Sequence, residues 1–456
     1  MKLTRYILML TIFMITTAYS QSAQEGVELI ENESGFGIRA AGMGNAYSAV
    51  ADDYSAIYWN PAGLAQMERG QVSGSLYHAT FDNNATYLNT SFSDSRTFTK
   101  LKSLGVIFPF PVYRGSFVIG FGYQKVNDLD MFSDFGGFSA KSNSFEIYDP
   151  DTEKYLTRFD KDLQQDFSTF REGGIDHWSF AAAIDLSENF SAGLTLNFLG
   201  GNSTFTQDYF QEDSRNMWQS IPDDYLDYNL RQRFIADYSG FNAKLGGLFH
   251  LSENLKLGTT ITFPYSITVD EEWSRSSVLN FDEDGVFSEA SENGNFDYLI
   301  EIPFQFSGGI SFTNKLFTLS SSVEYRDWSQ LKYEVPSNRE LDEDYDELLL
   351  ENGTIREDYQ AVLAYSFGGE IKIPKTGLML RGGYRNLPSP LKNVSSDYDK
   401  QFYSAGLGYK VDRRTAINFS YTEGSYRRDF DYLFSSESTS EDIKTKTILF
   451  GLNYNF

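Results

Sequence analysis

The chain has 456 residues, of which 63 are acidic and 38 are Lys or Arg, so its formal net charge is −25 at pH 7. A surface this acidic repels phosphate, which argues against nucleic-acid binding. The absence of cysteine excludes disulfides and thiolate metal sites, and an aromatic content of 16% favours half-buried β-structure.

The first twenty residues have the pattern of a secretory signal. Lys2 and Arg5 form a basic region, residues 6–15 are nearly all apolar, and small residues precede a predicted cut after Ser20. The apolar stretch is too short for a stop-transfer anchor. Removal of residues 1–20 leaves 36 basic residues against 63 acidic ones, a net charge of −27.

The next segment, residues 21–70, is crowded with small residues. Between 35 and 65 it reads GFGIRAAGMGNAYSAVADDYSAIYWNPAGLA, which is too polar and broken for a membrane helix. Small residues let backbone pack closely in a confined space. Short helical turns in this segment should end at Asn60-Pro61, because the residue before proline is driven away from the α conformation.

Beyond residue 70 the dominant pattern is alternation. In the tail KTKTILFGLNYNF, residues 444–456, apolar and mostly polar side chains alternate, which indicates a strand with two unlike faces. The same pattern predicts fourteen strands, near 71–81, 100–108, 115–126, 175–186, 188–200, 233–250, 254–268, 298–312, 315–327, 358–373, 376–385, 400–411, 413–424 and 443–456.

The links between these strands switch strictly between short and long. Turns such as SEN, TNK and PKT alternate with acidic stretches near 82–99, 127–174, 201–232, 269–297, 328–357, 386–399 and 425–442. Tight turns on one side and long polar loops on the other are typical of outer-membrane barrels. The sequence therefore predicts an all-β fold, in which residues 71–456 form a 14-stranded antiparallel transmembrane β-barrel. An even count places both termini on the short-turn, periplasmic side of a Gram-negative outer membrane.

The two strand faces have different expected surroundings. Outer-membrane lipid should meet the apolar face, and a closed sheet leaves no unpaired edge in the bilayer. The terminal aromatic Phe456 fits the last strand of a barrel that the outer-membrane barrel assembly machinery recognises. The lumen should be faced by Glu324, Arg326, Glu370, Lys372, Arg381 and Lys410.

A fourteen-stranded barrel encloses a lumen that wall side chains alone do not fill. Residues 21–70 precede the first strand and have no partner strand. We therefore predict that this segment, at least from residue 24, forms a hatch, or plug, inside the barrel.

The hatch sequence carries a family resemblance. GIRAAGMGNAYSAVADDYSAIYWNPAGLA resembles the hatch signature of the FadL/TodX family of outer-membrane transporters for long-chain fatty acids and other hydrophobic compounds. FVIGFGYQ at 117–124 and LMLRGGYRNLPSP at 378–390 also resemble that family, in the same order. The resemblance covers essentially the whole chain after the predicted signal.

The resemblance implies capture of a hydrophobic ligand at the outer loops, binding beside the hatch, and lateral release through a kinked third strand. The Asn-Pro-Ala motif of the family matches Asn60, Pro61 and Ala62, which become gating candidates. Replacing Asn60 and Pro61 should lower uptake and leave barrel assembly intact.

The third strand supplies the remaining candidates. Gly120 and Gly122 match the glycines of the family, and Phe121 between them is expected near the exit. Glycine weakens a strand and permits a bulge or kink. At 124–126 the chain reads Gln-Lys-Val, where the family has a stretch resembling Pro-Phe-Gly.

The sequence contains little that indicates catalysis, a cofactor or a metal site. His78, His177 and His250 fall on separate predicted strands, and no Ser-elbow or HExxH motif is present, so we predict neither an enzyme nor a bound cofactor. The acidic runs at 340–351 and 282–285 lack the spacing of a calcium loop, which favours solvated loops over metal sites.

Two features leave alternatives open. Loop aromatics are equally consistent with a landing groove for an apolar ligand and with simple loop packing: Phe132, Phe135, Phe138, Trp218 and Tyr225. The Asp52-Asp53 pair is expected to cap the hatch or neutralise lumen-facing Arg and Lys.

Two rival functions remain. Adaptor barrels of type IX protein secretion carry a similar small-residue and Asn-Pro-Ala signature but bind protein partners. A general polar pore is the other possibility, and a plug argues against it. A continuous apolar pocket beside the hatch would argue against the adaptor.

Overall fold

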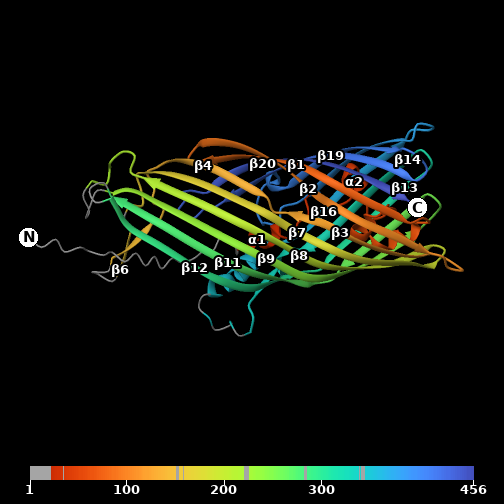
Figure 1. The fold of residues 1–456 in the computed structure, drawn as a ribbon, viewed down its shortest axis with the longest axis horizontal. Helices are drawn as coiled ribbons and strands as arrows, with labels where there is room; N and C mark the ends of the chain where they lie inside the picture. Colours follow the sequence, from red (N-terminus) through yellow and green to blue (C-terminus); the bar gives the residue numbers. More distant parts are fainter. Residues whose placement is uncertain are drawn as a thin grey trace, which may run out of the picture.

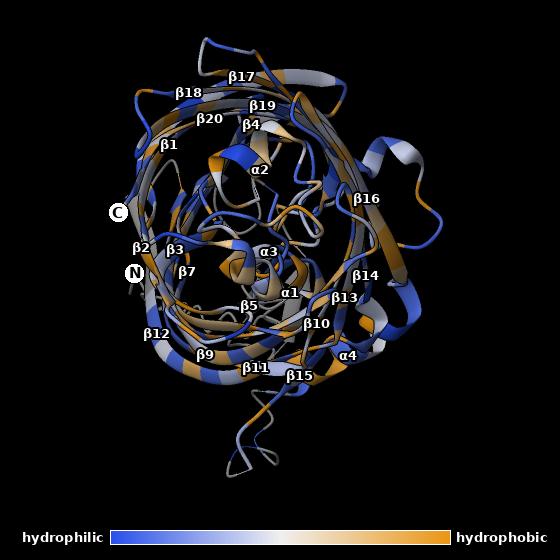
Figure 2. Cartoon of the chain, turned by 90° about the vertical axis from the view of Figure 1, so that its right-hand side faces the viewer, coloured by the Kyte–Doolittle hydropathy of each residue, from blue (hydrophilic) through white to orange (hydrophobic). Residues whose placement is uncertain are grey.

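The computed structural model is a closed antiparallel barrel with the amino-terminal elements inside it (Figures 1 and 2). It describes residues 22–33, 35–149, 154–157, 159–219, 225–281, 285–337, 339, 342 and 345–456, so the predicted signal at 1–20 lies outside the described residues. Eighteen strand elements form one sheet, and four barrel strands are interrupted into two elements each, which makes fourteen strands as predicted. Pairing of the first strand with the last closes the barrel.

The barrel strands follow one another in chain order, each paired with its neighbours. They are β1 (Gln71–Tyr87), β2 (Thr90–Phe110), β3 (Phe117–Asp128) with β4 (Met131–Ser139), β7 (Leu163–Ser187), β8 (Phe190–Glu212), β9 (Tyr225–His250), β10 (Leu255–Thr262) with β11 (Tyr265–Phe281), β12 (Gly285–Ile302) with β13 (Gln305–Thr313), β14 (Phe317–Asp327) with β15 (Lys332–Glu334), β16 (Ala361–Lys372), β17 (Leu378–Leu387), β18 (Lys400–Lys410), β19 (Thr415–Phe430) and β20 (Thr439–Asn455). A separate hairpin is formed by β5 (Glu146–Asp149) and β6 (Lys154–Thr157).

Several predicted long loops are in fact strand. The stretch 82–99 continues β1 and β2 up to a two-residue turn at Leu88 and Asn89, which both have positive φ. Outside the lipid the outer face of such a hairpin is polar and its inner face mixes polar residues with buried Ala85 and Tyr87, so hydrophobic alternation is too weak to reveal it. Cross-strand ion pairs join these extensions instead, as between Lys446 Nζ and Asp82 Oδ2 at 2.8 Å.

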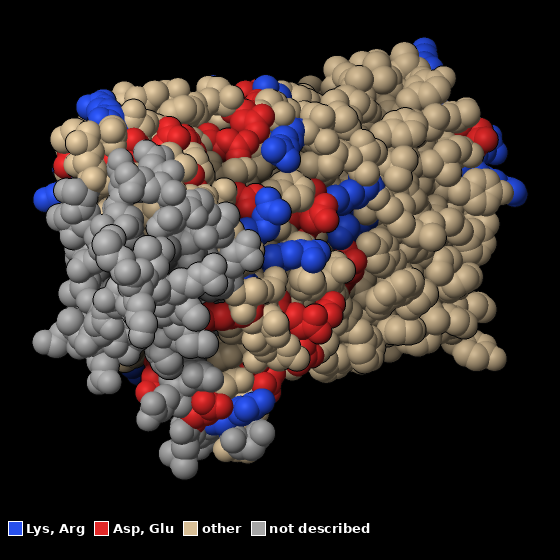
Figure 3. Space-filling model, turned by 60° about the vertical axis from the view of Figure 1, so that its left-hand side comes forward, with Lys and Arg blue, Asp and Glu red and all other residues tan. Residues whose placement is uncertain are grey.

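The outer surface is divided into two zones (Figure 3). Charged side chains gather on the half that carries the strand extensions, and the other half is nearly free of charge except at its far edge. Exposed apolar side chains such as Leu104 and Phe180 supply this band. Of the predicted lumen-facing residues, Lys410 is exposed at a strand end, and the others are buried or half-buried: Glu324, Arg326, Glu370, Lys372 and Arg381.

Four short helices lie within the ring of strands (Figure 2). They are α1 (Ala23–Glu28), α2 (Ile38–Gly42), α3 (Ala56–Trp59) and the 3-10 helix η2 (Pro61–Gln66). As predicted, α3 ends where Asn60 turns extended, with φ −157° and ψ 103°, before Pro61. Throughout the described residues, no helix is long and apolar enough to cross a membrane.

The interruption between β14 and β16 is filled by η3 (Trp328–Gln330), β15 and α4 (Asp346–Asp358), and a further 3-10 helix, η5 (Ser396–Tyr398), precedes β18. Part of the acidic run 340–351 is therefore helical rather than a loop, while Asp344 and residues 282–284 lie outside the described residues. Within the described part of the chain, no group of three or more His, Asp or Glu side chains is placed to hold a metal ion.

Candidate functional site

The hatch touches the wall where the wall has glycine. A Cβ added to Gly383 would lie 2.1 Å from Gly44 N, and one added to Gly368 would lie 2.0 Å from Met43 O. Any side chain at these positions would push the hatch away from the wall. The same close approach recurs around the barrel, at Gly105, Gly120, Gly122, Gly193, Gly246, Gly258, Gly406 and Gly451.

Asn60 is an anchor of the hatch and is fully buried. Its Nδ2 donates to Ser48 O at 2.8 Å and to Gly247 O of β9 at 3.1 Å, and its Oδ1 accepts from Ala62 N at 3.1 Å. Pro61 begins η2 and lies with Ala62 against Gly193 of β8. The motif thus joins two turns of the hatch to the wall.

The structure places the third-strand candidates differently from the prediction. Gly120 and Gly122 pair regularly with both neighbouring strands, and the bulge falls later, at Val126 between Lys125 and Asn127. The glycines serve close packing: added Cβ atoms would lie 2.9 Å from Ile57 Cδ1 and 1.9 Å from Tyr54 Oη. The expectation of a bulge at the glycines was wrong because their empty faces are filled by the hatch.

Phe121 points outward. It is 38% exposed in the apolar band, and its ring lies 4.6 Å from that of Phe180 and 5.8 Å from that of Trp178, both on β7. The side chain expected near the exit therefore lies on the outer face of the barrel rather than toward the lumen.

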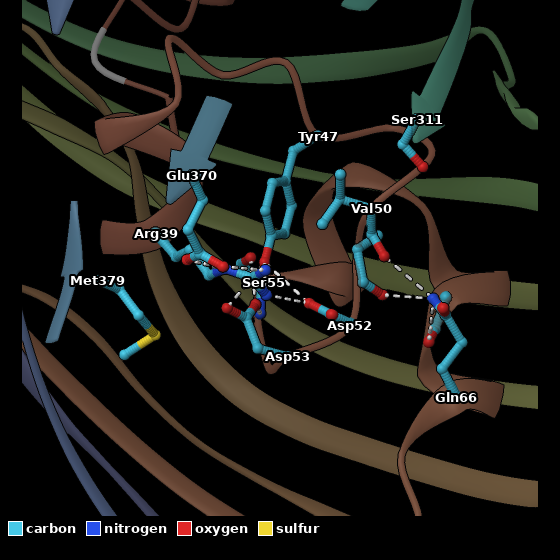
Figure 4. Close-up of polar contacts among 12 residues, drawn as sticks. Arg39, Tyr47, Val50, Asp52, Asp53, Ser55, Gln66, Ser311, Glu370 and Met379 are labelled. Carbon is cyan, nitrogen blue, oxygen red and sulfur yellow. Dashed lines mark hydrogen bonds and ion pairs between the residues drawn. The ribbon is translucent and has the colours of Figure 1, made fainter. Parts of the chain in front are cut away.

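At one end of the hatch, a buried ionic cluster ties α2 to the wall (Figure 4). Arg39 Nε and Nη2 donate to the two oxygens of Glu370 on β16 at 2.9 and 3.0 Å, and Arg39 also pairs with Asp52. The Tyr47 hydroxyl donates to Asp53 Oδ2 at 3.0 Å. Burial and the neighbouring Asp52 raise the pKa of Asp53. Asp52 and Asp53 thus meet groups of the hatch itself rather than basic side chains of the wall.

At the other end, a second set of ion pairs holds α1 and the residues that follow it. Arg171 of β7 lies 3.0 Å from Glu25 and 3.4 Å from Glu28. Lys400 of β18 lies 2.6 Å from Glu31 Oε2 and 2.7 Å from Glu33 Oε1. These contacts make the acidic segment 25–33 a counter-charge to basic side chains of the wall.

The two carboxyls of α1 have different electrostatic surroundings. Burial raises the pKa of Glu25 to about 8, and Arg171 only partly offsets this. Burial also disfavours the ionised form of Glu28, but Arg428 and Arg171 outweigh it and lower the pKa of Glu28. Glu28 is therefore the fixed anion of α1, and Glu25 is a titrating one.

The apolar side of α1 fills the middle of the barrel. Val27 and Leu29 are buried in a cluster with Ile300, Trp328 and Tyr333. The apolar interior at this level of the barrel is thus occupied by α1 and the residue that follows it.

Two cavities adjoin α1. The inner cavity, of about 110 Å³, lies between the hatch, β1 and the link from β3 to β4, with Ala79, Phe98 and Met131 among its lining residues. The outer cavity, of about 80 Å³, lies beneath the segment 387–391. They share one border of charged and aromatic side chains, formed by Glu28, Glu31, Lys400, Tyr426 and Arg428.

The inner cavity ends where two neighbouring strands of the wall stop pairing through their backbones, a point we call the ladder break. β2 pairs with β3 only as far as Ser103 and Gln124, and beyond the bulge β4 continues the pairing with β7. The free edge of β4 turns toward β1, where Asn83 Nδ2 donates to Phe132 O at 3.0 Å. This ladder break lies beside Leu101, at the edge of the exposed apolar band.

Side chains of β2 span the ladder break. Lys100 Nζ lies 3.0 Å from Asp128 Oδ1 and 2.7 Å from Asp130 Oδ1. The Arg96 guanidinium lies over the Phe132 ring, 4.8 Å from its centroid. The break is therefore closed by side chains that can move, rather than by backbone hydrogen bonds.

The loop aromatics close the charged end of the barrel. Phe135 and Tyr225 are buried in one large aromatic cluster, with Trp218 packed against it, and Phe132 is buried in a smaller neighbouring cluster. Phe138 lies under the guanidinium of Arg215, 3.3 Å from ring centroid to Cζ. Of the two alternatives, loop packing is the one that the structure shows.

Sequence reasoning missed the ion pairs beside the cavities. Lys400, Arg171 and Arg428 sit at polar positions of alternating strands, and such positions recur throughout the barrel. The acidic residues between 25 and 33 were the available signal, since buried carboxylates need cationic partners. Their partners are more than 100 residues away in the chain, so only the closed barrel identifies them.

Three solved structures of outer-membrane proteins have the same fold as this chain. The toluene transporter TodX of Pseudomonas putida has 14% identity and a TM-score of 0.59, with 93% of this chain and 99% of that chain covered. A FadL homologue of Pseudomonas aeruginosa has 13% identity and a TM-score of 0.57, with 93% and 98% covered. The toluene transporter TbuX of Ralstonia pickettii has 14% identity and a TM-score of 0.55, with 93% and 99% covered. At such identities the likeness establishes the fold.

Family membership rests on the sequence. No curated protein matches the chain. Residues 179–456 match the model of a family described as outer membrane protein transport protein (OMPP1/FadL/TodX). That match covers more than half of the chain, and the barrel and its hatch agree with it. The chain therefore belongs to the OMPP1/FadL/TodX family of outer-membrane transport proteins.

Proposed function

We propose that this protein carries hydrophobic compounds into the outer membrane by a route beside the hatch. The ligand enters the outer cavity, passes the shared border beside α1, occupies the inner cavity and leaves sideways at the ladder break of the third strand. The observation that carries the proposal is that the two cavities adjoin and that the inner one ends at the break.

The position of the break suits lateral release. It lies at the rim of the apolar band, so a ligand that leaves there meets lipid without crossing water. Burial of each methylene is worth about 0.8 kcal/mol, which lets a protein path hold an apolar chain without any chemical reaction. Long-chain fatty acids and the toluene named for two structural relatives both belong to this class of compound.

Transport requires the hatch to move. The cavities, of about 110 and 80 Å³, are each smaller than the roughly 150 Å³ cavity that binds benzene. A shift of α1 would open its apolar cluster and join the cavities. The ion pairs of Glu28, Glu31 and Glu33 hold α1 in place until then, so the structure represents the closed state of the path.

The ends of the barrel support the proposed orientation. Phe456 N donates to Gly70 O at 2.9 Å, so the end of the hatch and the last strand meet on the short-turn side. We propose that this side faces the periplasm and that the barrel assembly machinery reads the final strand there. The Phe456 ring is 51% exposed, which leaves it accessible.

A cross-link across the break tests the route. Because the chain lacks cysteine, Lys100→Cys with Asp130→Cys creates a single reactive pair that a reducible bis-maleimide can join. We expect the cross-link to lower uptake of radiolabelled toluene by intact Gram-negative cells at least five-fold, and reduction to restore it.

The matched control uses His78→Cys with Thr99→Cys, which face each other across the unbroken β1–β2 ladder. Cross-linking this pair should leave uptake unchanged. Full uptake by cells that carry the cross-linked Lys100→Cys, Asp130→Cys variant would refute lateral release at this break. A stably bound secreted protein, together with no uptake by the unmodified protein, would favour the type IX adaptor instead.

A further inference from the structure

The basic side chains that border the two cavities are all engaged by carboxylates. Lys400 Nζ lies within 2.7 Å of both Glu31 and Glu33, and its ammonium also lies over the Tyr426 ring at 4.9 Å. Arg428 lies 2.5 Å from Glu441 and 3.3 Å from Glu28. Among the described residues that line the inner cavity, each basic side chain is thus paired with two carboxylates. Arg171 contacts Glu25 and Glu28, Lys400 contacts Glu31 and Glu33, and Arg428 contacts Glu28 and Glu441.

The cavity lining is more acidic than basic. Glu28, Glu31, Glu33, Asp128 and Asp130 border the inner cavity. The bases on the same lining are Arg171, Lys400 and Arg428. Lys100 bridges Asp128 and Asp130, so the excess of acid that bears on a ligand is at Lys400, which faces both Glu31 and Glu33. A carboxylate that entered would meet these two carboxylates at short range, and a buried anion without its own cation is strongly disfavoured.

The charge pattern follows from the hatch. Glu31 and Glu33 belong to the segment between α1 and α2, and their carboxylates occupy the position beside Lys400 that a ligand carboxylate would take. The side chains of Lys400 and Glu31 are 16% and 10% exposed, so water screens this group little. An uncharged apolar ligand meets no such barrier.

We propose that the path selects uncharged hydrophobic compounds and excludes carboxylates, with Glu31 and Glu33 as the residues that determine this specificity. The inference rests on the proposed transport function and narrows its substrate class. Hydrocarbons, alcohols and esters are accepted, and ionised fatty acids are rejected because Lys400 is already neutralised.

The test compares two ligands of equal chain length, 1-octanol and octanoate, at pH 7.5. Equilibrium binding of each radiolabelled ligand is measured on the barrel in lipid nanodiscs, with empty nanodiscs subtracted. We expect octanoate to bind at least ten-fold more weakly than 1-octanol. In the double variant Glu31→Gln with Glu33→Gln, the ratio of octanoate affinity to 1-octanol affinity should rise at least ten-fold, because any loosening of α1 acts on both ligands alike.

Two controls isolate the cause. Glu188→Gln with Glu253→Gln removes the same charge from exposed turns and should change neither affinity. Adding Lys400→Met to the Glu31/Glu33 variant should abolish the gain for octanoate, and the single variant Glu33→Gln serves if the double variant fails to assemble. Equal binding of octanoate and 1-octanol by the unmodified barrel would overturn the selectivity alone. Binding of neither ligand would overturn the transport function as well.

Discussion

Replacing Gly122 by alanine tests whether the third-strand glycines act through the hatch. The added Cβ would lie 1.9 Å from Tyr54 Oη and 2.7 Å from Tyr54 Cζ. The Tyr54 hydroxyl, which lies 3.4 Å from Leu104 O and 3.3 Å from Tyr123 O, must leave its place. Overpacking costs about 1–3 kcal/mol and each lost hydrogen bond about 0.5–1.5 kcal/mol.

The hydroxyl has a single proton, so these two contacts count as one shared hydrogen bond, and we expect a total of about 2–4 kcal/mol against hatch docking. Since 1.4 kcal/mol corresponds to a factor of ten, the undocked population should rise roughly 30-fold or more. A single cysteine in place of buried Ala56 reports this population through its rate of maleimide labelling. Heat-modifiable gel migration should stay normal, because the strand ladder remains.

The control variant is Gly200→Ala, where an added Cβ on β8 meets nothing within 4 Å. It should label at the unmodified rate. In a Tyr54→Ala background the effect of Gly122→Ala on labelling should shrink to the part caused by the one remaining close contact, 2.8 Å from the added Cβ to Leu104 O of β2. An undiminished effect in that background would show that the glycine acts on the strand itself, and the reasoning from hatch packing would be refuted.

Three further outcomes are expected. Asn60→Ala removes three hydrogen bonds of a buried side chain of the hatch, at a cost of about 1–3 kcal/mol for the groups left unsatisfied. Uptake of hydrophobic ligand should fall while gel heat-modifiability stays normal, and unaltered uptake would count against a gating role. Glu370→Gln leaves Arg39 and Arg381 without their shared carboxylate and should weaken hatch docking by about 3–5 kcal/mol, read as faster cysteine labelling; labelling at the unmodified rate would contradict this. Burial raises the pKa of Glu25 to about 8 from 4.5, so docked α1 holds a proton that undocked α1 releases, and docking is strongest below about pH 4.5 and weakens as the pH rises toward 8. Hydrogen exchange of α1, corrected for intrinsic rates, should therefore be faster at pH 8.5 than at pH 6, and Glu25→Gln should remove the difference.

Within the lipid, the strands could be predicted because the hydrophobicity of the side chains and the direction in which they point both alternate with a period of two residues. Alternating residues such as those of 444–456 must face lipid or lumen, so the number of alternating segments predicts the number of strands. Outside the lipid this link is lost. The hairpin over 82–99 was predicted as a loop because its sequence is mostly polar, although Asn83, Ala85 and Tyr87 of its inner face are buried.

The candidate site was predicted only in part. Asn60 and Pro61 could be recognised because a proline stops a helix wherever it occurs, and the small residues around them marked a closely packed segment. Gly120 and Gly122 were identified, but their role was misassigned: a glycine can relieve strain in its own strand or make room for a neighbour, and its sequence does not distinguish the two. The close contacts of the two glycines with Tyr54 and Ile57 show that they make room for the hatch.

Local pattern thus determined the strand count, the hatch segment and the family resemblance, since each depends on residues close together in the chain. Tertiary structure alone decided the pairing of Lys400 with Glu31 and Glu33, the position of the ladder break, and the placement of α1 between two cavities. The Lys400 pairs join residues more than 350 positions apart, and the ladder break depends on how β2, β3 and β4 meet in space, so neither can be read from residues that are close together in the chain.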